Sequence, residues 1–167
     1  NPMTEGDELR CEVTAFDGED RSETATSSQS VVVANTPPEG DAVSLSPLGA
    51  TEEDTLRCEA VGAVDDPDAN AVTWTYIWKV NDLVIPDVSG EELDGAYFDR
   101  GDEVRCSGIP SDGLDEGAAV NSAYSITIEN TLPMLSDVVA SPMKSNKLGT
   151  FDCLALGWND PDPADAE

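Results

Sequence analysis

Histidine is absent from this chain, and cationic side chains are scarce. There are 8 Lys+Arg residues against 35 Asp+Glu, which gives a formal net charge of −27. Without histidine, Ser-His-Asp catalysis, Cys-His catalysis and His-ligated metal chemistry are excluded. The excess of carboxylates excludes nucleic acid and anionic lipid as partners, because phosphate groups would be repelled. The sequence also has no Gly-rich phosphate loop. The alternative is a glycosidase that uses paired carboxylates, but no pair stands in an evident cleft, and a module of this size has little room for one. We therefore expect no enzymatic activity.

Long apolar runs are missing too. No segment reaches the 18 or so apolar residues that span a bilayer, so we expect no membrane insertion. No signal-peptide pattern opens the chain, which suggests that residue 1 is not the natural N-terminus of a secreted precursor. Aromatic residues make up only 5%, yet 39% of residues are hydrophobic and fall in short alternating runs. This pattern predicts a folded chain with an acidic surface rather than a disordered one.

A repeat with a period of 95 residues organises the sequence. Cys11 and Cys106 are 95 residues apart, and so are Cys58 and Cys153. Aligned without a gap, residues 1–34 match residues 96–129 at 10 of 34 positions. The linker Asn-Thr-x-Pro also occurs twice, beginning at Asn35 and at Asn130. Self-similarity at a fixed period is the mark of a repeat array.

The repeat divides the chain into one whole module and two partial ones. Residues 35–130 form the complete module, residues 1–34 the C-terminal part of a preceding module, and residues 131–167 the N-terminal part of a following one. Alternating apolar positions predict seven strands in the complete module: 42–47, 55–63, 72–80, 83–85, 93–98, 102–108 and 120–129. With no helical periodicity longer than a turn, the fold expected is an all-β sandwich of about seven strands.

At this point a family resemblance can be stated. Cys58 on the second predicted strand, Trp78 on the third and Cys106 on the sixth resemble the Cys…Trp…Cys pattern of immunoglobulin domains. The linker and the Asp-Pro-Asp loop resemble the tandem immunoglobulin-like, polycystic-kidney-disease-type and cadherin-like repeats of large bacterial surface proteins. The resemblance implies tandem immunoglobulin-like modules arranged end to end. The spacing from Cys58 to Trp78 is wider than in antibody domains, so antibody-type binding is not implied.

This resemblance also implies a Cys58–Cys106 bridge between two sheets, with Trp78 packed beside it. The alternative is buried free thiols, but a repeated pair on facing strands suits a bridge better. By the same repeat, Cys11 and Cys153 would pair with cysteines of neighbouring modules. A disulfide places the protein outside a reducing cytoplasm, so the localisation expected is extracellular or at a cell surface.

Acidic loops recur near both linkers, at Asp65–Asn70 and at Asn159–Asp165. Alternate oxygen-bearing residues in a short loop suit Ca²⁺, which takes six to eight hard oxygen ligands. The predicted Ca²⁺ ligands at the first junction are Asn35, Asp66, Asp68, Asn70 and Asp112, with Asp7 from the preceding module; at the second junction they are Asn130, Asp160, Asp162 and Asp165, with Asp102 from the complete module. The alternative is that these residues are solvated turn-formers, since Asp, Asn, Pro and Gly favour loops for conformational reasons.

Two functions of different class fit this sequence. The first is a structural repeat protein, a disulfide-braced and calcium-stiffened stalk or fibre on a cell surface or in a matrix. Its partners would be neighbouring modules of the same protein, with self-association into fibres as a variant. The second is an adhesin module that recognises glycan or protein, for which Trp74 and Trp78 could provide a stacking surface. Trp78 suits a core position better, and Trp74 shares its strand face.

Overall fold

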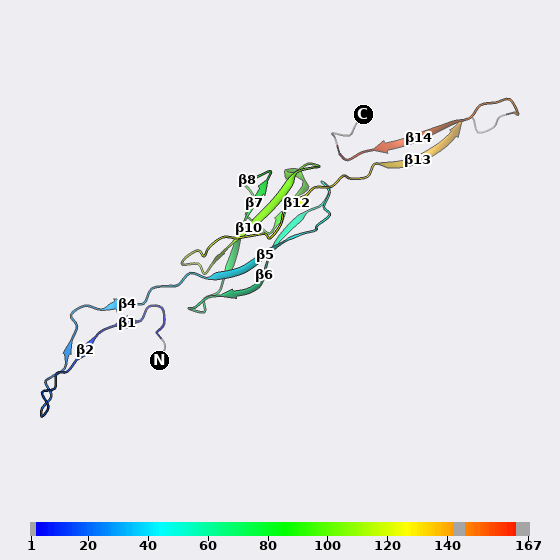
Figure 1. The fold of residues 1–167 in the computed structure, drawn as a ribbon. Helices are drawn as coiled ribbons and strands as arrows, with labels where there is room; N and C mark the ends of the chain where they lie inside the picture. The colour runs from blue at the N-terminus through cyan, green and yellow to red at the C-terminus, as the bar shows by residue number, and fades with distance from the viewer. Residues whose placement is uncertain (1–2, 142–145, 163–167) are drawn as a thin grey trace. The chain divides into compact units, whose positions relative to one another are not determined.

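A computed structural model describes residues 3–141 and 146–162 (Figure 1). In these residues the chain is all-β, and its one helical element is a 3₁₀ turn, Gly95–Tyr97. The predicted all-β class is thus confirmed. No helix of the described ranges has the length and apolarity to cross a membrane. The chain divides into two compact units, residues 1–41, 62–74 and 109–119, and residues 42–61, 75–108 and 120–167.

Two sheets form the central part of the chain. One has three strands in the order β5 (Glu39–Ser46), β6 (Leu56–Asp65) and β9 (Glu92–Leu93). The other has five, with β7 (Thr73–Val80) between β8 (Leu83–Ile85) and β10 (Glu103–Ser111), and with β11 (Val120–Asn121) and β12 (Ile126–Thr127) both paired to β10. Five of the seven predicted strands correspond to single observed strands, with bounds shifted by up to three residues.

Two predicted strands are corrected by the structure. The segment 120–129 is interrupted between β11 and β12, where the Ser122 hydroxyl donates to the carbonyl of Tyr124 at 2.9 Å. The segment 93–98 leaves the sheet after Leu93, because Asp94 caps the 3₁₀ turn by accepting from the N–H of Ala96 at 2.9 Å. In both places a short polar side chain offers the backbone a local partner that competes with the sheet.

The hydrophobic core lies in the second unit. Along β7, Tyr76, Trp78 and Val80 are buried while Thr75 on the opposite face is exposed, as the alternation predicted. Trp78 is fully buried, and its indole N–H donates to the carbonyl of Gly90 at 2.9 Å, which satisfies its polar atom. The other buried hydrophobic side chains are Val43, Leu45, Ala50, Leu56, Cys58, Leu93, Phe98, Val104, Cys106, Ile126 and Ile128.

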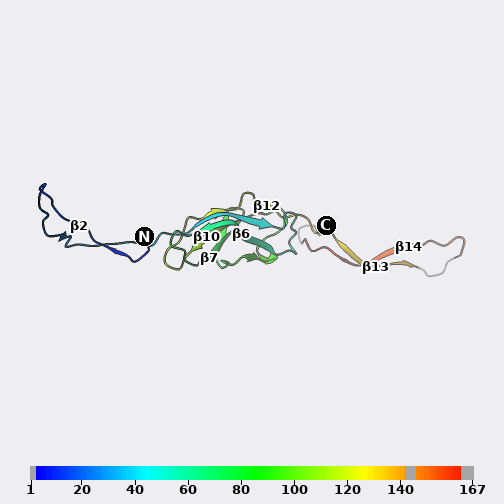
Figure 2. The ribbon, with the colours of Figure 1, turned by 90° about the horizontal axis from the view of Figure 1, so that it is seen from below.

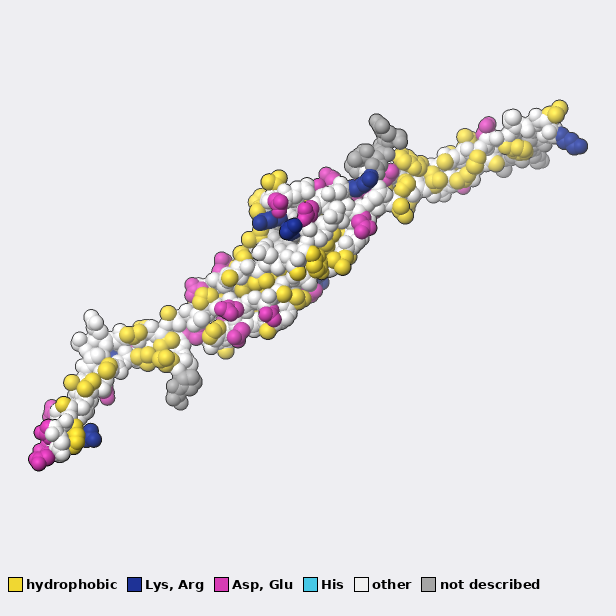
Figure 3. Space-filling model, in the orientation of Figure 1, with side chains coloured by type: hydrophobic (Ala, Val, Ile, Leu, Met, Phe, Trp, Pro, Cys, Tyr) yellow, Lys and Arg dark blue, Asp and Glu magenta, His cyan; other side chains and the backbone are white. Residues whose placement is uncertain are grey.

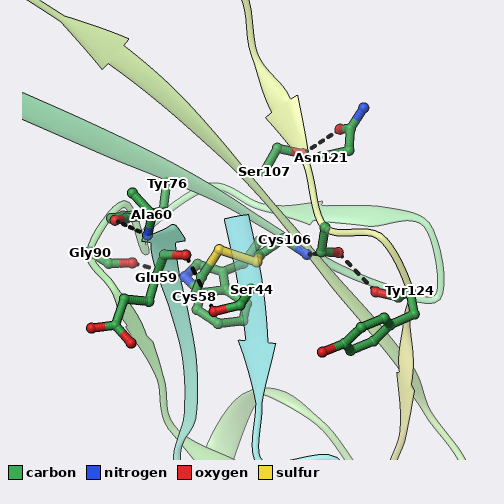
Figure 4. The surroundings of a disulfide bond; sticks show 12 residues. Ser44, Cys58, Glu59, Ala60, Tyr76, Gly90, Cys106, Ser107, Asn121 and Tyr124 are labelled. Atoms are coloured by element: carbon green, nitrogen blue, oxygen red, sulfur yellow. Dashed lines mark hydrogen bonds between the residues drawn. A yellow bond between two sulfur atoms is a disulfide. The ribbon is translucent and has the colours of Figure 1, made fainter. Parts of the chain in front are cut away.

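The predicted Cys58–Cys106 disulfide is present in this core (Figure 4). It joins β6 of the three-stranded sheet to β10 of the five-stranded sheet across a sequence separation of 48. Both cysteines are buried, whereas Cys11 and Cys153 are free and exposed. The bridge therefore ties the two sheets together from the inside.

Further pairs of strands precede and follow these sheets in the sequence. In the first unit, β1 (Glu8–Leu9) pairs with β4 (Val31–Val32), and β2 (Glu12–Val13) pairs with β3 (Ala25–Thr26). In the second unit, β13 (Met134–Ser141) and β14 (Asp152–Asn159) run side by side as an antiparallel hairpin (Figures 1 and 2). Hydrophobic side chains line this hairpin in Figure 3, and its exposed members include Leu135, Val138, Leu154, Leu156 and Trp158.

Candidate functional site

The same hydrogen bonds occur at positions 95 residues apart. The N–H of Cys11 donates to the Ser27 hydroxyl at 3.2 Å, and the N–H of Cys106 donates to the Ser122 hydroxyl at 3.4 Å. In return, the N–H groups of Ser27 and Ser122 each donate to the cysteine carbonyl at 2.8 Å. The turns before the two cysteines also match: the N–H of Thr4 donates to Asp7 Oδ2, and the N–H of Asp99 donates to Asp102 Oδ2. Residues 4–33 and 99–128 therefore share these local hydrogen bonds.

The first candidate site centres on Asn35, in the first unit. The Asn35 amide donates to Asp112 Oδ2 and to Asp115 Oδ2, both at 2.9 Å. Its carbonyl oxygen accepts from the Asn70 amide at 3.4 Å, and the same Asn70 amide donates to Glu5 Oε2 at 3.3 Å. Asn35 therefore joins the loop that carries Asn70 to the loop that carries Asp112 and Asp115. We call these residues the Asn35 cluster: Glu5, Asn35, Asn70, Asp112 and Asp115.

Asp112 in this cluster is held in its charged form. Its Oδ1 accepts from the backbone N–H groups of Leu114 and Asp115, both at 2.7 Å. These donors, the Asp115 N–H first and the Asn35 amide next, lower the pKa of Asp112 below its ordinary value. Asp112 thus presents ionised carboxylate oxygens at neutral pH.

A turn at Asp66–Asp68 adjoins this cluster. Asp66 Oδ1 accepts from the N–H of Asp68 at 2.8 Å and from the N–H of Asn70 at 3.3 Å. Asp68 Oδ2 accepts from the linker N–H of Thr36 at 2.7 Å. The other oxygen of Asp66, Oδ2, is buried without a hydrogen-bond partner. One carboxylate oxygen here therefore lacks a donor, which is costly unless something else compensates its charge.

The second unit holds the corresponding turn at Asp160–Asp162. The N–H of Asp162 donates to Asp160 Oδ1 at 3.3 Å, and Asp162 Oδ2 accepts from the linker N–H of Thr131 at 2.8 Å. Asp162 is only 1% exposed, and its Oδ1 has no hydrogen-bond partner. The Thr131 hydroxyl oxygen is likewise buried and unpartnered.

Glu52, which the sequence analysis did not single out, lies beside Asp162. Its Oε2 accepts from the N–H of Arg100 at 3.3 Å. Burial, followed by the carboxylates of Asp162 and Asp99, raises the pKa of Glu52 above its ordinary value, against the effect of the Arg100 N–H. The sequence signal was only a run of acidic residues at 52–54 in a predicted loop, and such runs are common on acidic surfaces.

Other predicted ligands have different surroundings. Asp7 and Asp102 each accept from a backbone N–H three residues earlier, from Thr4 at 3.0 Å and Asp99 at 2.8 Å. Asp102 also accepts from the Asn81 amide at 2.6 Å. The Asn130 amide donates to the carbonyl of Thr131 at 2.8 Å. Asp165 lies outside the described residues.

Within the described ranges, no three acidic or cysteine side chains are close enough together to form a ready-made metal centre. The structure brings together Asn35, Asn70 and Asp112 in the first unit, with the Asp66–Asp68 turn adjoining. It brings together Asp160, Asp162 and Thr131 in the second. The first group offers carboxylate and amide oxygens, and the second offers carboxylate and hydroxyl oxygens. Hard oxygen donors of these kinds suit a hard cation. Comparison with known proteins found no matching family model, no matching curated protein and no matching solved structure.

Proposed function

We propose that this chain is a segment of an extracellular structural protein, a tandem array of immunoglobulin-like β-sandwich modules that forms a stalk or fibre. In this proposal residues 35–130 are one complete module between two partial ones. A disulfide braces each module internally, and calcium bound at the junctions stiffens the array. The protein acts by its length and rigidity, not by catalysis.

The observation that carries the proposal is the recurrence of hydrogen bonds with the sequence period. Residues 4–33 and 99–128 share the turn before the cysteine, the cysteine–serine pair and the closing pair of backbone bonds. Structural repeats of this kind stack into quasi-one-dimensional arrays in which each unit contacts its neighbours. An array of that kind suits a spacer or fibre.

The disulfide and the surface charge support an extracellular place. A buried structural disulfide forms and persists in oxidising compartments. The charge of −27 keeps such a chain soluble, because copies of it repel one another. Both features suit a protein exposed to the medium.

Calcium at the junctions is supported by the two aspartate turns. In each, one aspartate fixes the turn and a second accepts from the linker N–H, at 2.7 Å for Thr36 and 2.8 Å for Thr131. In each, a buried carboxylate oxygen is left without a donor, on Asp66 and on Asp162. A hard cation would compensate these oxygens and reduce the repulsion between neighbouring carboxylates.

Calorimetric melting of the chain in excess calcium and in excess chelator tests the calcium part of this proposal. Extracellular sites of this type have dissociation constants of about 10⁻⁴ to 10⁻³ M. Calcium at ten times that value should add about 1.4 kcal/mol for each site by linkage. The gain should be larger at low salt, where carboxylate repulsion is less screened. An unchanged melting temperature together with no heat of calcium binding would refute it and leave solvated turns.

A second candidate function, glycan binding, is favoured by one hollow in the first unit. The hollow has a volume of about 410 Å³ and is lined by Val64, Asp65, Asp66, Ala69, Asn70, Val72 and Trp74. The Trp74 ring lies against Gly40, where an added Cβ would collide with it. An aromatic face beside carboxylates is a surface on which a sugar can stack and donate hydrogen bonds. Binding on a glycan array that Trp74→Ala abolishes would favour this function; a blank array would exclude the tested sugars.

A further inference from the structure

Three segments of the second unit meet around the Asp162 carboxylate. The first is the turn that carries Glu52, where the N–H and the hydroxyl of Thr51 donate to Asp54 Oδ2 at 2.8 and 3.0 Å. The second is the linker, which is fixed beside this turn by the N–H of Glu129 donating to the carbonyl of Ala50 at 2.7 Å. The third is the Asp160–Asp162 turn, held to the linker through the N–H of Thr131. The Glu52 turn and the linker residues Glu129 and Asn130 belong to the complete module. Thr131 and Asp162 belong to the next module.

Two further contacts fix the position of Glu52. Its carboxylate accepts from the N–H of Arg100, and its own backbone carbonyl packs against Gly95, where an added Cβ would collide with it. The Glu52 side chain is therefore not a freely moving surface group. It is held beside a second carboxylate by the folded backbone.

Two oxygens at this place lack any partner. Asp162 is 1% exposed, and its Oδ1 has neither solvent nor a hydrogen-bond donor. The hydroxyl oxygen of Thr131 is buried and unpartnered in the same way, and the backbone of this residue contacts the other oxygen of Asp162. A buried carboxylate without a donor and next to another carboxylate is unfavourable unless a proton or a cation lies between them.

We propose that Glu52, Asp162 and the Thr131 hydroxyl form a binding site for a Ca²⁺ ion shared between two successive modules. This inference rests on the proposed function and adds the ligands that join the modules. Glu52 contributes from the complete module, and Asp162 and Thr131 contribute from the following one. Two carboxylates match the charge of a divalent cation, and water and backbone carbonyls can complete the six to eight oxygen ligands.

The chemistry of the ligands favours calcium over transition metals. All three groups are hard oxygen donors, and this chain has no histidine to offer nitrogen. A flexible arrangement of carboxylate and neutral oxygens is typical of Ca²⁺, whereas Mg²⁺ demands near-ideal octahedral geometry and retains more water. A single ion held by both modules would resist separation of the linker from the Glu52 turn.

The test counts Ca²⁺ ions bound to the 167-residue chain by native mass spectrometry and measures their affinity by calorimetry. Glu52→Gln keeps the size of the side chain and removes its charge. The matched control is Glu53→Gln, which makes the same charge change at an exposed neighbour. Asp66→Asn serves as the reference for the first junction. Near-native circular dichroism must accompany each variant.

The proposal expects Glu52→Gln to lose one bound ion, or to weaken one site by about tenfold or more, because the charge count of the ligands sets the affinity. Glu53→Gln should bind as the unchanged chain does. If Glu52→Gln does not fold, Thr131→Val removes a ligand oxygen at nearly constant volume and should also weaken that site. Calcium binding that Asp66→Asn weakens and Glu52→Gln leaves unchanged would overturn this inference and leave the proposed function intact. An unchanged chain that binds no Ca²⁺ would overturn this inference and the calcium part of the proposed function together.

Discussion

Removing the Cys58–Cys106 bridge should destabilise the central sheets strongly. The bridge closes a loop with a sequence separation of 48. In the chain-entropy model, opening a loop of that length costs about 4 kcal/mol of unfolding free energy, because the denatured chain gains freedom. Replacing both cysteines with alanine avoids leaving a buried free thiol and keeps the change in volume small.

The loss can be measured by urea unfolding followed through tryptophan emission. Trp78 is fully buried, so its emission reports on the core that the bridge joins. The free energy of unfolding of a small protein falls by about 1–3 kcal/mol for each 1 M of urea. A loss of about 4 kcal/mol in that free energy therefore lowers the urea midpoint by roughly 1–4 M. The corresponding fall in melting temperature is about 15–30 °C for a domain of 60–100 residues.

The other two cysteines provide the control. Cys11 and Cys153 are exposed and free, so Cys11→Ala combined with Cys153→Ala should change stability by no more than about 0.5 kcal/mol. If the Cys58→Ala and Cys106→Ala pair lost less than about 1 kcal/mol, or no more than the control pair, the bridge would not be what holds the sheets together. That result would refute the reasoning.

Three further predictions follow from the same structure. Burial, with a smaller contribution from nearby Glu91 and Glu59, raises the pKa of Tyr76 above its ordinary value, so the folded state holds the phenol proton more tightly than the unfolded state. The contribution of Tyr76 to the free energy of unfolding should be fully present below the ordinary tyrosine pKa, and it should be lost as the pH rises through the raised pKa of the folded state. Tyrosinate absorbance should show a late-titrating tyrosine that Tyr76→Phe removes. Leu93→Ala should cost about 2–5 kcal/mol in urea unfolding because Leu93 is fully buried, whereas Leu48→Ala at a 65% exposed position should cost less than about 0.5. Gly117→Ala should cost about 1–3 kcal/mol because its Cβ would meet the carbonyl oxygen of Pro38, whereas Gly90→Ala has open space; thermal melts of both variants check this.

Much of the fold could be predicted because its signals are strong and local. Apolar alternation placed β7 and the burial of Trp78 correctly, and the turn at Asn81–Asp82 located β8 at the residues observed. The disulfide followed from cysteines on two predicted strands. These features depend on strand periodicity, which the sequence displays directly.

The errors arose where side chains compete with the sheet. Ser122 and Asp94 make local hydrogen bonds that end or interrupt a strand, although the apolar pattern continues past both. The periodicity of apolar residues contains no information about such local bonds. Both predicted strands therefore continued too far.

The candidate sites were predicted only in part, for a different reason. Asp66, Asp68 and Asn70 share a short loop, so their spacing in the sequence indicated their proximity. Glu52 reaches Asp162 from a turn more than a hundred residues earlier in the chain, and no spacing rule connects the two. Contacts of this kind depend on how the strands bring distant loops together, and that requires the three-dimensional structure.

Small-angle scattering of the 167-residue chain in calcium tests the array most directly. If the modules lie end to end, the radius of gyration should be well above the value of about 15 Å that a compact domain of this length would have. Adding excess chelator should then broaden the distribution of interatomic distances, because the junctions would lose the ions proposed to stiffen them. A radius of gyration near the compact value, whether or not calcium is present, would contradict the account.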